Sequence, residues 1–158
     1  MSRKKSRGAV TDIEARLAEL GLTLPQPKPP VANYLNTKRS GDLLFVSGRV
    51  SQMRGEVGRE ITIQKAQQAA RDTVLDLLAS IKEDLGGTLA PVVAIERLHG
   101  FIRSAPDFTQ HPVVLDGASD LLIALWGDAG RHARSATGVL QLPFGAAVQL
   151  ELIARLAR

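Results

Sequence analysis

The sequence has no cysteine, few aromatic residues and no long apolar run. Of its 158 residues, 4% are aromatic. Without thiols the chain cannot form a disulfide, a Cys-ligated zinc site, an iron–sulfur cluster or a cysteine nucleophile, and a reducing cytoplasm suits it. No apolar run approaches the ~18 residues that a membrane helix needs, and no apolar segment follows the basic N-terminus. We therefore expect a cytoplasmic protein with no membrane partner.

Sequence motifs for phosphate, dinucleotide and metal binding are also missing. The chain has no P-loop, no GxGxxG after a strand and no GxSxG elbow. Its three histidines, His99, His111 and His132, are spaced unlike any metal-ligand pattern. The sequence therefore predicts no metal site.

The positive charge is concentrated at the N-terminus. The formal net charge of +4 equals the charge of Arg3, Lys4, Lys5 and Arg7, so the rest of the chain is neutral. We expect residues 1–10 to be a basic disordered tail and residues 11–158 to form a single domain. The tail is either a solvated leader or a weak, salt-sensitive attraction for phosphate. The neutral body has few aromatic residues, so the sequence shows no surface on which nucleic-acid bases could stack. This disfavours nucleic acid as a partner.

Hydrophobic periodicity predicts an α+β domain. Helices are expected over 11–20, 63–85 and 112–126, and strands over 32–37, 43–46, 49–51, 92–103, 133–141 and 146–154. Ser47-Gly48 either ends the strand at 43–46 or forms a bulge in it. Thr11 and Glu14 suit a capping box, and Thr62 suits a second N-cap. Four prolines in 24–30 predict an extended connector. This order predicts a mixed sheet with two long helices packed on one face. Because no third long helix is available, we expect other subunits to cover the opposite face.

Two segments are candidates for binding chemistry. In GRHARSATG (130–138), Arg131 and Arg134 stand at the entrance to a strand of small residues. Such an arginine can grip a carboxylate with its planar fork or form an ordinary surface salt bridge. In the last strand, Gln149 and Glu151 share one face. They could line a ligand site, face a hydrated cavity or pair with charges of a neighbouring subunit.

Four segments taken together resemble one known family. They are PVANY (30–34), GDLLFVSGRV (41–50), SAPDFTQHPVVLDGASDLL (104–122) and GRHARSATGVLQLPFGAAVQLELIA (130–154). They resemble the Rid/YjgF family of reactive imine/enamine deaminases, formerly endoribonuclease L-PSP, and most closely its longer branch with an N-terminal helix and a GRHARSA motif. The resemblance covers residues 10–158. It implies a chorismate-mutase-like fold of the Bacillus type, assembled as a homotrimer with ligand sites between subunits and with no cofactor.

The resemblance also assigns the substrate-binding residues. Arg134 matches the arginine that holds the substrate carboxylate, and Tyr34 matches a tyrosine that lines the cleft. Ser47 and Gly48 match a segment whose small side chains let the ligand approach. Ala136 stands where many relatives have cysteine, so no thiol contributes there.

The catalytic assignment contains the main departure from the family. Gln149 falls on the position of the water-orienting glutamate, and an amide cannot accept a proton at neutral pH. Glu151 matches a second acidic position and could partly compensate. Loss of a general acid or base typically costs a factor of about 10²–10⁴ in rate.

Three functions follow from the resemblance. The first is hydrolytic deamination of small reactive imines or enamines that bear a carboxylate, such as 2-aminoacrylate, to a keto acid and ammonia. The alternative, favoured by Gln149, is a non-catalytic trimer that binds a small carboxylate or keto acid. The third, action as an endoribonuclease or translation inhibitor, has the least support because the body is neutral.

Overall fold

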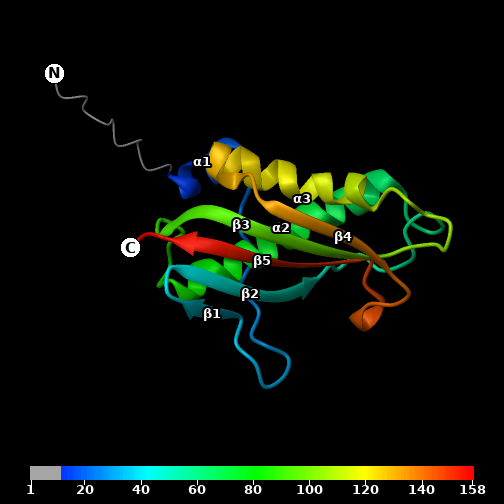
Figure 1. Cartoon of the computed structure of the whole chain (residues 1–158), viewed down its shortest axis with the longest axis horizontal. Helices are drawn as coiled ribbons and strands as arrows, with labels where there is room; N and C mark the ends of the chain where they lie inside the picture. Colours follow the sequence, from blue (N-terminus) through cyan, green and yellow to red (C-terminus); the bar gives the residue numbers. More distant parts are fainter. Residues whose placement is uncertain (1–11) are drawn as a thin grey trace.

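The computed structural model describes residues 12–158, in which helices and a sheet form two layers. The expected tail at 1–10 lies outside the described residues. Helix α2 (Ile63–Asp84) and helix α3 (His111–Trp126) lie together on one face of the sheet (Figure 1). The short helix α1 (Ile13–Glu19) packs against α3. Within residues 12–158, no helix combines the length and the apolar character needed to cross a bilayer.

Within residues 12–158 the sheet has mixed direction, as the sequence predicts, and five strands instead of the six expected. Its strands are β1 (Thr37–Ser40), β2 (Leu43–Val50), β3 (Val92–Arg103), β4 (Ala133–Val139) and β5 (Val148–Leu156), in the spatial order β1-β2-β5-β3-β4. β3 and β4 are parallel, and the other neighbouring pairs are antiparallel. Strand β5 is therefore central, and β4 forms an edge.

The core lies between the sheet and the two long helices. On β5, alternate residues from Val148 to Leu156 are buried, while Gln149, Glu151 and the other residues between them are partly exposed. This alternation is the period-two pattern of a strand with one buried face. It places Gln149 and Glu151 on the sheet face away from the helices, so their predicted shared face is confirmed.

The sequence predicts an N-cap residue for α1 and another for α2. The Thr62 hydroxyl accepts a hydrogen bond from the Lys65 amide at 3.3 Å, so this predicted N-cap is confirmed. At α1, Asp12 is the N-cap and accepts from the Ala15 amide at 3.0 Å. The predicted cap residue Thr11 lies outside the described residues. Glu14, the partner expected for Thr11 in a capping box, accepts from the Leu89 amide at 2.7 Å through Oε1.

The strand predictions before residue 51 are partly wrong. Residues 32–35 form bends, and the first strand begins only at Thr37. The strands predicted at 43–46 and 49–51 are one strand, β2, whose register shifts between Val46 and Arg49. Such a β-bulge inserts extra residues while pairing continues on either side. Of the two outcomes expected at Ser47-Gly48, an end or a bulge, the structure shows the bulge.

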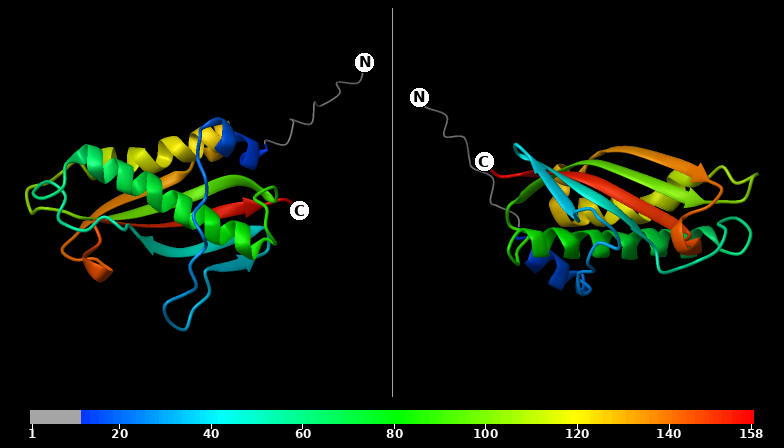
Figure 2. Two further views of the ribbon diagram at one scale, coloured as in Figure 1. Left: turned by 180° about the vertical axis from the view of Figure 1, so that it is seen from behind. Right: turned by 90° about the horizontal axis from the view of Figure 1, so that it is seen from below.

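The second face of the sheet has no helix over it among the described elements (Figure 2). Phe45 on β2 is 43% exposed on this face, next to Lys38 and across from Ile153 in the strand pairing. His99 and Phe101 of β3 stack with ring centroids 4.2 Å apart. We call this surface the open face.

Candidate functional site

A cavity of about 280 Å³ lies beside the free edge of β2, and we call it the edge cavity. β1 pairs with residues 43–46 of β2, so among residues 12–158 no strand lies beside the outer edge of residues 47–50. The Ser47 amide instead donates to the Asn36 carbonyl at 2.9 Å. Loop 28–34, helix α2, strand β5 and the turn 143–144 complete the walls. The lining residues are Lys28, Val31, Tyr34, Gly48, Arg49, Val50, Asp76, Pro143, Phe144 and Gln149.

The structure brings together three of the predicted site residues, Tyr34, Gly48 and Gln149. A Cβ added at Gly48 would lie 3.2 Å from the Gln149 amide nitrogen, which is tighter than an ordinary contact. The absence of a side chain at residue 48 therefore leaves the space that the Gln149 amide occupies. Tyr34 is 40% exposed at the cavity.

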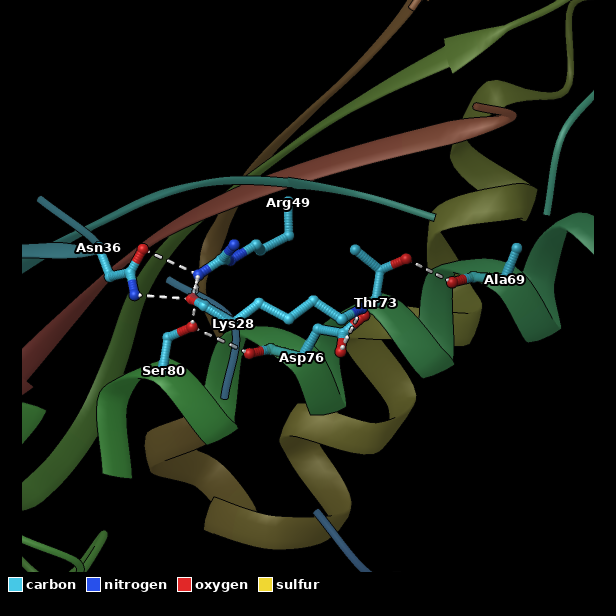
Figure 3. A network of polar contacts seen from close by, with 7 residues as sticks. All are labelled: Lys28, Asn36, Arg49, Ala69, Thr73, Asp76 and Ser80. Carbon is cyan, nitrogen blue, oxygen red and sulfur yellow. Dashed lines mark hydrogen bonds and ion pairs between the residues drawn. The ribbon is translucent and has the colours of Figure 1, made fainter. Parts of the chain in front are cut away.

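Arg49 is the cation that Figure 3 shows at the centre of the polar contacts beside this cavity. Its Nη2 donates to the Lys28 carbonyl at 2.7 Å, to Asn36 Oδ1 at 2.8 Å and to Ser80 Oγ at 3.1 Å. Asn36 and Ser80 are buried, so one end of the guanidinium is fixed in place. Its Nε and Nη1 donate to no group within residues 12–158. They remain available to a ligand.

The cavity also holds an ion pair between loop and helix. Lys28 Nζ lies 3.4 Å from Asp76 Oδ1, and the Asp76 side chain is only 12% exposed (Figure 3). The Ser80 hydroxyl donates to the Asp76 carbonyl at 3.2 Å. With Arg49, Lys28 and Asp76, the cavity carries one net positive charge, which suits a small anion.

Ser47 and Glu151 lie in a different depression, of about 250 Å³, on the open face. The Ser47 hydroxyl donates to the Leu35 carbonyl at 2.6 Å. The Glu151 carboxylate lies 3.6 Å from His99 Nδ1. Within one copy of the chain, neither residue lines the edge cavity, and the role predicted for each stays a prediction.

Arg134 and Ala136 lie on the helix-facing side of β4. They pair with Leu98 and Gly100 of β3, both of which are buried against the helices. Arg134 Nη1 donates to Asp116 Oδ1 at 2.9 Å and to Ser119 Oγ at 3.1 Å, and both acceptors belong to α3. Ala136 packs against the core. The structure of one chain therefore does not bring Arg134 to the edge cavity, and its predicted contact with substrate stays a prediction.

The GRHARSA segment fastens β4 to α3. His132 Nε2 lies 2.9 Å from Ser119 Oγ, and His132 Nδ1 lies 2.6 Å from the Gly130 carbonyl. With Nδ1 protonated, the ring donates to that carbonyl and accepts from Ser119. At Gly130, an added Cβ would lie 2.3 Å from the Leu122 carbonyl oxygen. Only glycine lets the chain pass this close to α3.

Acid is expected to weaken this connection through His132. Burial, and to a smaller extent the charge of Arg134, lower the pKa of His132 below its ordinary value of 6.5. The unfolded chain then binds the proton more tightly, so the stabilisation is present above pH 6.5 and is lost as the pH falls through the lowered pKa. Urea unfolding at pH 7.5 and 5.0 should show a smaller acid loss in His132→Gln than in wild type. Equal losses in both proteins would contradict this prediction.

A second histidine makes a similar contact at the start of α3. Ser104 Oγ lies 2.9 Å from His111 Nε2, and burial lowers the pKa of His111. Within residues 12–158, no carboxylate bonds to the His111 ring, so no catalytic triad forms. Nor does the described part of the chain contain a cluster of three or more His, Asp or Glu side chains suited to a metal ion.

Reasoning from the sequence missed Arg49, Asp76 and Phe144 as cavity residues. Arg49 directly follows Ser47-Gly48, and this adjacency was the available signal. Asp76 is one of several polar residues on a long helix, and its sequence position carries no comparable signal. Phe144 has φ 60° and is 67% exposed. A bulky side chain in the left-handed region is uncommon and draws attention to the turn that forms this wall.

Comparison with known proteins agrees with the fold. The family model described as YjgF/chorismate mutase-like, putative endoribonuclease matches residues 14–156. Protein TCP17 of Trypanosoma cruzi is 38% identical over 151 residues, which cover 91% of this chain and 94% of that protein.

Two solved structures are similar over most of the chain. The protein Atu1372 of Agrobacterium tumefaciens, of unknown function, is 39% identical with a TM-score of 0.85, covering 92% of each chain. A putative endoribonuclease from Shewanella oneidensis is 31% identical with a TM-score of 0.87, covering 92% of this chain and 99% of that one. The chain therefore belongs to the Rid/YjgF family.

Proposed function

We propose that the edge cavity binds a small 2-imino acid or enamine and hydrolyses it to a keto acid and ammonia. The observation that carries this proposal is the meeting of Tyr34, Gly48 and Gln149 with the partly unengaged guanidinium of Arg49. Both two-bond forks of a guanidinium use Nη2, which is already engaged, so Arg49 offers a substrate carboxylate one charge-assisted hydrogen bond, from Nη1 or from Nε. Arg49 is thus the anchor that one copy of the chain can supply.

The remaining walls suit the rest of such a substrate. The Gln149 amide can hydrogen-bond a water molecule or the imine nitrogen. Val31, Phe144 and the ring of Tyr34 form an apolar side that can contact the substrate side chain. Imine hydrolysis is intrinsically easy, so holding the imine carbon beside an oriented water can supply much of the acceleration.

The test generates imines with an amino-acid oxidase and follows their disappearance with and without the protein. We expect acceleration for at least one imine that bears a carboxylate. No acceleration over buffer across several amino acids would refute the enzymatic function.

We propose further that the protein is a homotrimer in which other copies cover the open face. Exposed Phe45 and Val93 and the stacked rings of His99 and Phe101 support a covered surface. Light scattering on the protein used in the imine assay measures its molecular mass. We expect the mass of three copies of the chain. The cytoplasmic location stays a prediction that rests on the absence of cysteine.

The second candidate function is binding without turnover. The specific observation in its favour is Gln149, whose amide cannot take up a proton. Calorimetry with short 2-keto acids would then show binding while the imine assay stays at background. RNA cleavage remains the third prediction, and the neutral body of the chain still gives it the least support.

A further inference from the structure

The edge cavity contains a carboxylate that the sequence did not point to. Among the described residues that line it, Asp76 alone is acidic. It lies on α2, across β2 from the face that carries Gln149. Its side chain is 12% exposed, so the carboxylate is shielded from bulk water but still reaches the cavity.

The proposed hydrolysis needs a group that moves protons, and few cavity residues can do so. A guanidinium and an ammonium have no lone pair to accept a proton, and an amide is not a base at neutral pH. These limits exclude Arg49, Lys28 and Gln149 from that task. A carboxylate held near a bound water satisfies it.

We propose that Asp76 is the proton-transferring residue of the edge cavity; this rests on the proposed function. Water attacks the carbon of the protonated imine, forming the C–O bond while the C=N π pair moves to nitrogen, and Asp76 takes the water proton. Asp76 then gives that proton to the amine nitrogen of the carbinolamine. The C–N bond breaks, ammonia leaves, the C=O bond forms and the hydroxyl proton returns to Asp76. Ammonia finally takes this proton as ammonium.

The ion pair with Lys28 leaves Asp76 free for this role. The contact of 3.4 Å involves only Oδ1 and is longer than a charge-assisted hydrogen bond. Asp76 Oδ2 has no ion-pair or hydrogen-bond partner among residues 12–158. The competing explanation is a tether: Asp76 could serve only to hold loop 28–36 against α2.

The experiment compares Asp76→Asn with Asp72→Asn in the imine assay. Asp72 lies one turn earlier on α2, is exposed and accepts a hydrogen bond from Gln68 at 2.8 Å. We expect Asp76→Asn to lower kcat by a factor of about 10²–10⁴ while its affinity for a short 2-keto acid stays close to that of wild type. Asp72→Asn should keep the wild-type kcat.

A rescue variant separates catalysis from tethering. Gln149→Glu supplies a carboxylate from β5 and is expected to raise kcat by itself, so the double variant Asp76→Asn/Gln149→Glu is compared with Gln149→Glu alone. If Asp76 transfers the proton, Asp76→Asn should lower kcat at least tenfold less in the Gln149→Glu background than in wild type. If Asp76 only holds loop 28–36 against α2, a new carboxylate on β5 cannot replace that contact, and the effect of Asp76→Asn would be the same in both backgrounds. If Asp76→Asn does not fold, Asp76→Glu keeps the acidic group for Lys28 but moves it by one methylene, and kcat should fall with little change in Tm.

The outcomes are distinct. An active wild type whose kcat is unchanged in Asp76→Asn would overturn this proposal and leave the proposed function standing. An active wild type in which Asp76→Asn lowers kcat by the same factor with and without Gln149→Glu would assign Asp76 to the tether and also overturn it. A wild type that accelerates no imine would overturn the proposed function and this proposal together.

Discussion

Gly117→Ala is expected to destabilise the protein by about 3 kcal/mol, the upper end of what an overpacked core usually costs. Gly117 lies in α3 where this helix touches α2. An added Cβ would lie 2.1 Å from the Gln67 carbonyl oxygen and 2.7 Å from its carbonyl carbon. Because these are backbone atoms of α2, no side-chain rotation can relieve the clash. The two helices would have to separate, and urea unfolding would measure the loss.

The matched control for this substitution is Asp120→Ala. Asp120 lies three residues later on α3 and is exposed, so alanine there should change the free energy of unfolding by about 0.5 kcal/mol at most. If Gly117→Ala were as stable as this control, the two helices could move apart at little cost in free energy, and the prediction would be wrong.

Arg49→Met is expected to weaken binding of a short 2-keto acid by a factor of about 10–100, which corresponds to the 1.5–3 kcal/mol of a hydrogen bond to a charged group. The substitution removes the guanidinium that faces the edge cavity. It also leaves the buried Asn36 Oδ1 without its donor, so some loss of stability should accompany it. Calorimetry on folded protein, checked by circular dichroism, separates the two effects.

Three further substitutions sharpen the result. Arg49→Lys keeps the charge, but a single ammonium group cannot bond to Asn36 and reach the ligand from a separate nitrogen, so it should recover only part of the affinity. Arg39→Met is the control for lost charge, because within residues 12–158 the Arg39 side chain bonds to the Gly41 carbonyl alone. Arg134→Met decides between the two arginines. If it abolishes binding while Arg49→Met does not, the anchor is Arg134, supplied from a neighbouring copy.

Much of the fold could be predicted because its signals are local. The apolar spacing from Ile63 to Leu85 and the N-cap Thr62 define α2 without reference to any other segment. The alternation of apolar residues likewise predicts the last strand, although β5 runs over Val148–Leu156 and not over the expected 146–154. The main errors in the strand predictions lie at residues 32–51, where glycine and serine weaken the periodicity and pairing with β5 decides the register.

The candidate site was only partly predictable, because proximity across the fold has no local signal. Tyr34, Gly48 and Gln149 were assigned by the resemblance, and the structure brings them to one cavity. Arg134 was assigned in the same way. In one copy of the chain, however, it bonds to Asp116 and Ser119 of α3 on the helix-facing side of the sheet, away from the edge cavity. Which side of a strand meets a helix depends on the register of the whole sheet.

The sequence by itself determined the class of fold, the neutral cysteine-free body and the amide at residue 149, because these follow from composition and short-range pattern. Only the tertiary structure decided where the charges meet. The early end of β1 leaves the edge of residues 47–50 open, and the bulge before Arg49 turns its guanidinium toward α2. A cavity with Arg49, Asp76 and Gln149 in its walls results from that pairing, since segments far apart in sequence become neighbours only when the sheet and helices pack.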